Sequence, residues 1–344
     1  LLDLAKEIPI YADGIKKYVI GDPKAILMVE FIDNDLNIIN KKIKDLESLV
    51  KSQNKNNNFS YFKEIKDQKE IFEIRKAGLN ILMSMKGDKK PVAFIEDCAV
   101  TLDHLAEYTT KLKEIFKKYD TSGMFYAHAS VGTLHVRPVL NMKSDKDINN
   151  MKKIAEEAFE MVKQYKGSHS GEHGDGIVRS EFHEKMFGKK IINAFEEVKD
   201  TFDHKNLLNP NKIVRPYKSN DRSLMRYKAN YKTEKISTHY DWSEWGQFSD
   251  AVEMCNNNGA CRKLDSGVMC PSYRVTKEEK DLVRGRANTL RLALSNQLPK
   301  GSFQSKEMYE SMELCVSCKA CQRECPMSVD IAKMKSEFLS HYYK

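Results

Sequence analysis

The cysteines of this chain carry its clearest chemical signal. Seven of the eight lie between Cys255 and Cys325. Residues 315–326 read CVSCKACQRECP, a C-x2-C-x2-C-x3-C-P run. Such short spacers let three thiolates bind one 4Fe-4S cluster, while the fourth cysteine reaches another cluster. Zinc also accepts four thiolates, but zinc sites usually pair two C-x2-C knuckles, so we predict at least one 4Fe-4S cluster.

The spacing also divides the cysteines into two predicted ligand sets. The fourth ligand of the first cluster should come from a distant Cys-Pro pair, which Cys270 and Pro271 supply. The first set is then Cys270, Cys315, Cys318 and Cys321. The remaining set is Cys255, Cys261 and Cys325, with Asn258 where a middle cysteine would stand. That second set could bind a cluster with an oxygen or external fourth ligand, a three-iron cluster, or no metal.

Two histidines near the middle of the chain have the spacing of a strand hairpin. They occur in YAHASVGTLHVRPVL as His128 and His135. On one straight strand this spacing would point them to opposite faces. If the segment turns at Val131-Gly132, the two become directly opposed on one face, with Cβ atoms about 5 Å apart. Two imidazoles so placed can share a metal ion.

A glycine-rich loop further on supplies the other groups that a catalytic metal needs. In SGEHGDG, residues 170–176, Glu172 offers a carboxylate ligand and His173 an adjacent base. Two His and one Glu with an open position suit a catalytic Zn²⁺ or a similar divalent ion. The alternative is that these are ordinary strand and loop histidines that make hydrogen bonds. We assign no role to the remaining histidines, which are His104, His169, His183, His204, His239 and His341.

The elements that must position these groups indicate an α+β fold. Buried strands are predicted at 24–33 (KAILMVEFID) and 91–100 (PVAFIEDCAV), with a further β segment at 124–140. Apolar residues at helical spacing predict helices near 34–50, 69–83, 102–119, 145–165 and 181–202. This order predicts an antiparallel sheet with helices on one face.

The cysteine-rich end reads as a separate helical module. Residues 215–245 lack sustained periodicity and are polar and aromatic, so the boundary between modules falls there. Beyond it, Thr276 and Glu279 form a capping-box arrangement ahead of a helix that continues to Leu294. We predict three parts, which are residues 1–216, a linker at 217–245 and an all-α iron-sulphur domain at 246–344.

Composition excludes several classes of protein. The chain has 344 residues, of which 41% are hydrophobic and 31% charged, which is typical of two or three soluble domains. Its formal net charge of +8 comes from Lys and Arg scattered among Asp and Glu, so nucleic-acid binding is not expected. No apolar stretch approaches the roughly 20 residues of a transmembrane helix. The opening has neither Met nor a signal-peptide pattern, so we interpret the chain as a fragment, and the clustered cysteines indicate a reducing compartment.

Several of these motifs together resemble a known enzyme family. GEHGDGIVRSEFHEKMFG, HA-x5-LHVRPVL and LLNPNKIV are similar to the C-terminal half of FAD-linked D-2-hydroxyacid dehydrogenases of the vanillyl-alcohol oxidase superfamily. CNNNGACRK, MCPSYR and CVSCKACQRECP resemble the ferredoxin-type module fused to such enzymes in bacterial D-2-hydroxyglutarate and D-lactate dehydrogenases. The first likeness covers roughly residues 1–216, and the two together account for nearly the whole chain.

The resemblance implies the kind of domain in each part and the roles of four residues. Residues 1–216 would be an FAD-linked oxidase C-terminal, or cap, domain, and 246–344 a ferredoxin-type 4Fe-4S domain. FAD would be bound mainly by an N-terminal domain that this sequence does not show. The metal ligands of the family match His128, His135 and Glu172, and its proton-abstracting residue matches His173.

The resemblance also implies contacts to flavin and substrate. Asn209 in LLNPNKI matches a position near the flavin, and Arg75 in FEIRKAGLN matches an arginine that binds the substrate carboxylate. Relatives without iron-sulphur modules that act on D-2-hydroxyglutarate often have Asn where this chain has Arg137. This departure leaves the substrate open, although a second guanidinium could bind a second carboxylate.

We therefore expect flavin-dependent oxidation of a D-2-hydroxy acid to the 2-oxo acid, with D-2-hydroxyglutarate favoured over D-lactate. Electrons would pass from FAD through the clusters to a quinone, a cytochrome or an electron-transferring flavoprotein. Two alternatives are a non-catalytic electron-transfer subunit, in which residues 1–216 are only a docking platform, and a metal-dependent hydrolase. We also expect a cytoplasmic homo-oligomer, with peripheral contact to the inner membrane as the open alternative.

Overall fold

The computed structural model describes residues 2–7, 9–53 and 58–344, which cluster into two compact units, Leu1–Ile81 and Leu82–Lys344. The predicted boundaries after residues 216 and 245 both fall inside the second unit and stay predictions. None of the described helices combines the length and apolar character needed to cross a bilayer.

The first unit is helical. It contains α1 (Leu2–Glu7), α2 (Pro9–Tyr18), α3 (Leu36–Gln53), α4 (Ile65–Lys76) and the start of α5 (Gly78–Met83). Ala5, Ile15 and Ile81 form its small buried core. The prediction of a helix near 34–50 is confirmed by α3, whereas the helix predicted at 69–83 is interrupted at Ala77.

The strand predicted at 24–33 is wrong. These residues have no regular structure, and their apolar side chains are exposed, with Leu27 at 71% and Ile32 at 80%. A strand needs a neighbouring ladder for its backbone groups, and the described residues of this unit include no strand. The apolar run therefore has no partner within its own unit.

The second unit begins with a four-stranded antiparallel sheet. Its strands are β1 (Lys89–Pro91), β2 (Cys98–Ala99), β3 (Gly123–His128) and β4 (Thr133–Asn141). The long strand β4 pairs with each of the other three. The strand predicted at 91–100 is wrong in its extent, because the chain leaves the sheet after Pro91 and returns only at Cys98. Between them Asp97 has a left-handed φ of 76°, which continuous strands do not contain.

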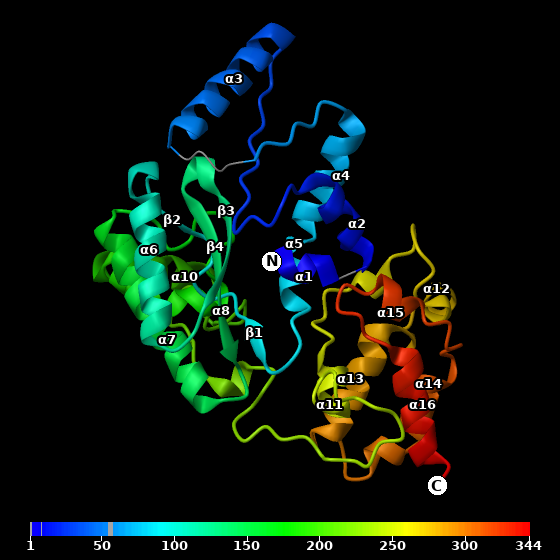
Figure 1. Ribbon diagram of the computed structural model, residues 1–344. Coiled ribbons are helices and arrows are strands. Elements are labelled where there is room, and N and C mark those ends of the chain that lie inside the picture. Colours follow the sequence, from blue (N-terminus) through cyan, green and yellow to red (C-terminus); the bar gives the residue numbers. More distant parts are fainter. Residues whose placement is uncertain (1, 8, 54–57) are drawn as a thin grey trace. The chain divides into compact units, whose positions relative to one another are not determined.

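Two long helices cover this sheet, as the pattern predicted. They are α6 (Leu102–Lys118) and α7 (Asp145–Gln164), which lie side by side (Figure 1). Tyr108 and Phe116 of α6 and Phe159 of α7 pack with Val136 of β4 in one buried core. Burial of this apolar face, at about 25 cal/mol per Å², stabilises the layer against which the glycine-rich loop at 170–176 is folded.

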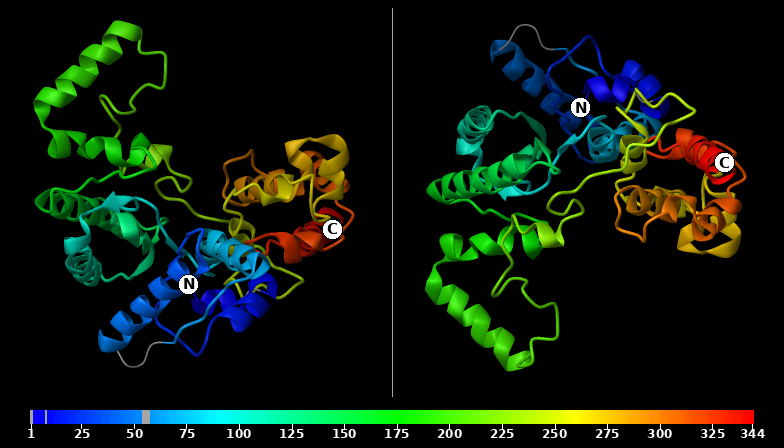
Figure 2. Two further views of the ribbon diagram at one scale, coloured as in Figure 1. Left: turned by 90° about the horizontal axis from the view of Figure 1, so that it is seen from above. Right: turned by 90° about the horizontal axis from the view of Figure 1, so that it is seen from below.

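Beyond the glycine-rich loop the chain forms three shorter helices. They are α8 (Gly176–Arg179), α9 (His183–Phe187) and α10 (Lys189–Phe202). The single helix predicted at 181–202 is wrong, because Gly188 adopts a φ of 82° and separates α9 from α10. Helix α10 has no buried residue, and Figure 2 shows it standing away from the sheet layer.

The cysteine-rich end is helical, as predicted. Its helices are α11 (Phe248–Glu253), α12 (Pro271–Thr276), α13 (Val283–Leu294), α14 (Lys306–Glu313), α15 (Ala320–Glu324) and α16 (Ile331–Tyr342). The predicted capping box is wrong, because Thr276 ends α12 instead of starting a helix. Before these helices, residues 217–245 contain only a short 3-10 turn at Arg222–Leu224, within a segment described throughout.

Candidate active site

The β3–β4 hairpin brings His128 and His135 together on one face. Their ring centroids are 5.2 Å apart and the rings are perpendicular. The prediction that the two are directly opposed is wrong, because His128 pairs with Thr133 and His135 with Tyr126. The turn spans residues 129–132, and this register makes the histidines diagonal neighbours. Diagonal neighbours still share a face, so both imidazoles remain available to one metal ion.

Glu172 completes a set of three donor atoms. Its Oε1 lies 3.3 Å from His135 Nε2 and 3.8 Å from His128 Nε2. Two ligands about 2.0–2.1 Å from a tetrahedral Zn²⁺ are about 3.3 Å apart, which matches the distance between Glu172 Oε1 and His135 Nε2. The donor atoms that all lie within 4.8 Å of one another belong to Asp97, His135, Glu172 and His173, and this group does not include His128. Burial lowers the pKa of His135, helped by the neighbouring His173, which favours the neutral imidazole that binds metals. His128 and Glu172 are 39% and 47% exposed, so the site is open to a substrate on one side.

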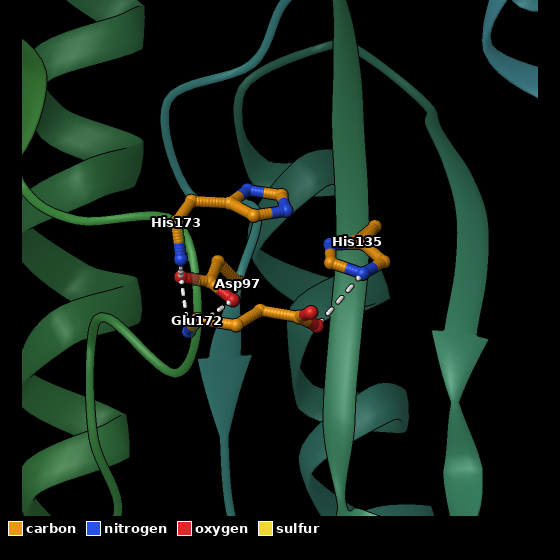
Figure 3. A group of neighbouring side chains, drawn as sticks. All are labelled: Asp97, His135, Glu172 and His173. Atoms are coloured by element: carbon orange, nitrogen blue, oxygen red, sulfur yellow. Dashed lines mark hydrogen bonds and ion pairs between the residues drawn. The ribbon is translucent and has the colours of Figure 1, made fainter.

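His173 lies directly beside these donors. Its ring stacks on that of His135, with centroids 4.9 Å apart and planes 9° from parallel (Figure 3). Its Nδ1 lies 3.5 Å from Glu96 Oε1, and the other oxygen of Glu96 forms an ion pair of 2.5 Å with Arg137. Glu96 is buried. Through these two contacts it connects the candidate base His173 to the candidate substrate-binding residue Arg137.

The loop that carries Glu172 and His173 is fastened by Asp97. One carboxylate oxygen accepts hydrogen bonds from the backbone N–H groups of both Glu172, at 2.9 Å, and His173, at 2.7 Å. The second oxygen also accepts from Glu172 at 2.9 Å, and Figure 3 shows the Asp97 carboxylate between the backbone nitrogens of His173 and Glu172. Asp97 lies close enough to the donors to be a ligand, but its oxygens already serve the backbone. We assign it the role of a positioning residue.

Sequence reasoning missed both Glu96 and Asp97. The signal that could have found them is the pair of adjacent acids inside the apolar run PVAFIEDCAV. Buried carboxylates are rare unless they are paired or hydrogen-bonded, so two of them beside a strand indicate a site.

The first predicted cysteine set lines one cavity in the helical module. Cys270, Cys315, Cys318 and Cys321 all face it. Burial raises the pKa of the Cys270 thiol to about 12, so a thiolate there needs a cationic partner such as iron. Four thiols around one cavity fit a 4Fe-4S cluster, and Pro271 starts α12 directly behind the ligand at Cys270.

The second predicted set is also gathered in one place. Burial, together with the smaller effect of the nearby thiols of Cys255 and Cys261, raises the pKa of Cys325 to about 11. Asn258, which stands where a middle cysteine was expected, is exposed and bonds within its own loop to Asn256 and Ala260. The three thiols fit a cluster whose fourth ligand is not a cysteine of this loop.

A buried cation lies beside the first set. Arg286 is 1% exposed and lines the same cavity. It donates hydrogen bonds to the carbonyls of Asp281, at 2.7 Å, and Ser311, at 2.8 Å, and to the Ser272 hydroxyl at 3.1 Å.

The family of the chain follows from comparison with known proteins. Residues 10–213 match the family of FAD linked oxidases, C-terminal domain, which is more than half of the chain. The chain belongs to this family. Residues 251–329 match a 4Fe-4S dicluster domain. The resemblance inferred from its motifs, and the fold of a sheet domain followed by an iron-sulphur domain, are thereby confirmed.

Relatives of this chain include several proteins named as dehydrogenases. It is 29% identical to D-2-hydroxyglutarate dehydrogenase of Escherichia coli, over 92% of this chain and 35% of that protein. Identity to the D-2-hydroxyglutarate dehydrogenase of Pseudomonas putida is 30%, over 79% of this chain and 30% of that protein. Identity to a mitochondrial D-lactate dehydrogenase [cytochrome] of Arabidopsis thaliana is 26%, over 56% and 33%. The chain thus spans about a third of the length of these relatives.

Two further predicted site residues belong to other segments of the chain. Arg75 is in the last turn of α4, in the first unit. Asn209 follows α10 in an exposed loop, with a left-handed φ of 48°, and its Oδ1 accepts a hydrogen bond of 3.4 Å from Lys212. Both stay predictions.

Proposed function

We propose that the chain provides the metal-binding and substrate-binding site of a flavin-dependent D-2-hydroxy acid dehydrogenase, together with its iron-sulphur electron-transfer module. D-2-hydroxyglutarate is the favoured substrate and D-lactate the next. The observation that carries the proposal is the convergence of His128, His135 and Glu172 beside His173. Relatives named for these two substrates support it.

The chain's own residues divide the chemistry among them. The divalent ion, with zinc favoured, would be held by His128, His135 and Glu172. When bound, this ion lowers the pKa of the substrate hydroxyl, FAD accepts the hydride from the α-carbon, and the clusters pass the electrons on singly. His173 removes the hydroxyl proton, and Glu96 near its Nδ1 favours the tautomer whose Nε2 accepts that proton.

Substrate and flavin contacts complete the proposal. Arg75 would bind the substrate carboxylate, and Asn209 would lie near the flavin. Arg137 is paired with Glu96, so a second substrate carboxylate would have to share its guanidinium with that side chain. A five-carbon diacid can make this contact and lactate cannot, which is the reason that D-2-hydroxyglutarate is favoured.

The remaining parts of the proposal concern the surroundings of the enzyme. All seven cysteines from Cys255 to Cys325 would bind clusters, one in each set. The acceptor would be a quinone, a cytochrome or an electron-transferring flavoprotein. We propose a homo-oligomer in the cytoplasm, with peripheral contact to the inner membrane as the alternative.

The test replaces His173 by Asn in enzyme loaded with FAD and clusters. Loss of a general base costs about 10²–10⁴-fold in rate, so anaerobic reduction of the flavin by D-2-hydroxyglutarate and D-lactate should slow by that factor. The cluster EPR signals should not change. The matched control is His104→Asn on the exposed side of α6. Equal flavin reduction in His173→Asn and the control would favour the electron-transfer subunit instead.

A further inference from the structure

A second group of histidines and a carboxylate lies buried behind the catalytic loop. It consists of His169, Asp175 and His183, to whose histidines the sequence assigned no role. His169 is 1% and His183 2% exposed. One ligand atom from each of the three residues lies within 4.8 Å of the other two. These residues are separate from the ligands of the proposed active site.

The side-chain polar atoms of these three residues lie close together but form few hydrogen bonds with one another. His183 Nε2 is 3.0 Å from Asp175 Oδ2, and His169 Nε2 is 3.8 Å from Asp175 Oδ1. In spite of these contacts, neither ring nitrogen of either histidine has a hydrogen bond of acceptable geometry to any described residue. An unsatisfied buried polar group costs about 1–3 kcal/mol, so four such nitrogens indicate that a component is missing.

A cation would satisfy these atoms together. The separations of 3.0 and 3.8 Å bracket the roughly 3.3 Å between two ligands of a tetrahedral Zn²⁺. Nitrogens that approach a carboxylate without pointing at it have the arrangement expected when all three side chains point at a shared ion. A hydrogen-bonded His-Asp-His chain would instead require the ring N–H groups to aim at the oxygens.

The surroundings also favour a bound metal. The rings of Phe159 and Phe187 lie edge-on to His169, with centroids 5.4 and 5.5 Å away, and exclude water. Burial lowers the pKa of His169 to about 4, so its imidazole is neutral. Arg179 is the nearby cation, but its two terminal nitrogens donate to the carbonyls of Gly174 and Glu96.

We propose that His169, Asp175 and His183 form a second, structural site for a divalent metal of the zinc class. His169 and Asp175 flank the segment that carries Glu172 and His173, and His183 belongs to α9. One ion at this point therefore joins both ends of the catalytic loop to the helix behind it. Its burial leaves no route for a substrate, so its role is to hold the loop.

The test counts metal in the full chain with its clusters loaded. Zn²⁺ is removed with a chelator and returned, and bound zinc is measured by mass spectrometry. Wild type should retain two ions per chain, His183→Gln one, His135→Gln one and the double variant none. In the difference spectrum between the Co²⁺-loaded and Zn²⁺-loaded protein, Co²⁺ should add no thiolate-to-metal bands, which excludes its binding by cysteines. His104→Gln is the control and should retain two.

The outcomes separate this site from the proposed active site. Equal zinc in wild type and His183→Gln would overturn the inference. A loss in His183→Gln without one in His135→Gln would support it and would contradict the metal role of the active site. If His183→Gln does not fold, the zinc content of His135→Gln still tests the second site. This variant should retain one zinc ion if the second site exists and no zinc ion if it does not. Chelation of His135→Gln should also speed hydrogen exchange in residues 170–176.

Discussion

At the residue scale, a single buried carboxylate positions both the proposed metal ligand Glu172 and the proposed base His173. Asp97 is fully buried, and its three hydrogen bonds come from the two backbone N–H groups that precede the side chains of Glu172 and His173. Its own backbone is left-handed, a conformation that Asp tolerates better than most residues. The backbone strain of this left-handed conformation thus occurs at Asp97, the residue that orients the glycine-rich loop.

Replacing Asp97 by Asn tests this role. The amide keeps the shape but loses the charge that strengthens hydrogen bonds from N–H groups. We expect metal at the active site to bind about 10–100-fold more weakly, as is usual when a partner of a ligand is removed. Zinc titration should show this loss, whereas Asp103→Asn on the exposed side of α6 should bind as wild type does. Unchanged affinity in Asp97→Asn would mean that the loop is held by other contacts.

At the element scale, the turn between β3 and β4 determines how the two histidines meet. Gly132 has a φ of 71°, and a Cβ atom built on it would lie 1.8 Å from the carbonyl oxygen of Val100. The turn can approach the end of β2 this closely only because residue 132 has no side chain.

Gly132→Ala should therefore destabilise the protein by about 2–4 kcal/mol, through backbone strain and the clash together. Gly87→Ala is the matched control, because Gly87 also has a positive φ, of 83°, but nothing lies within 4 Å of its added Cβ. Chemical denaturation of both variants measures the difference. Similar losses in the two would show that strain alone, without the contact to Val100, accounts for the effect.

Glu181 connects α7 to the segment that leads to the iron-sulphur domain. It lies 2.7 Å from Lys152 of α7 and accepts a hydrogen bond of 2.7 Å from the backbone of Ser219. Burial by itself would raise the pKa of Glu181, but hydrogen bonds from Lys152, Ser219 and Lys218 outweigh it and lower the pKa to about 2.

The pH dependence of this contact has a definite sign. A carboxylate with a depressed pKa in the folded state stabilises the protein above its ordinary pKa, and this contribution is lost as pH falls toward the folded value. Wild type should thus be more stable than Glu181→Gln at pH 7, and the difference should shrink between about pH 4.5 and pH 2. Thermal melts across this range, with Glu184→Gln as the exposed control on α9, measure it. A difference independent of pH would exclude the charge as its source.

The sequence predicted residue types at this scale better than it predicted their geometry. The motifs around His135 and His173 predicted side chains that the structure does bring together, because metal ligands and bases belong to few residue types. The prediction that His128 and His135 are directly opposed was wrong because strand register depends on the length of the turn. The sequence did not distinguish a turn of two residues from one of four. The left-handed backbone of Asp97 and the meeting of His169 with His183 arise from tertiary contacts, which no local pattern contains.

At the scale of the whole molecule, the segment at 217–245 connects the sheet domain to the cysteine-rich helical module. Arg222 forms an ion pair with Asp145 of α7, and Tyr231 donates a hydrogen bond of 2.6 Å to Glu253 of α11. Lys143, just before α7, also lies 2.7 Å from Glu253. The sheet domain and the helical module therefore contact each other through buried and half-buried charges.

The two cysteine sets predict distinct outcomes for iron content. Wild type loaded anaerobically should contain about seven or eight irons, from one 4Fe-4S cluster and one cluster with three cysteine ligands. Cys318→Ser should lose the first cluster, and Cys325→Ser the second, each with its own EPR signal. Buried Cys98, outside both sets, supplies the control Cys98→Ala. About four irons in wild type, with no change in Cys325→Ser, would show that only the first set binds a cluster.

The buried guanidinium of Arg286 bears on the direction in which electrons move. A cluster with four thiolates is an anion, and reduction makes it more negative. Arg286 lines the cavity of the first cysteine set, whereas Asp281, 3.6 Å from it, is not among the described residues that do so. Burial raises the pKa of Cys270 and the positive charge of Arg286 opposes that rise, so this charge acts on a thiol of this set, in surroundings where charge is poorly screened. If the first set binds the proposed cluster, this charge would stabilise the reduced form and raise the reduction potential, which would favour electron transfer from the proposed flavin to the cluster.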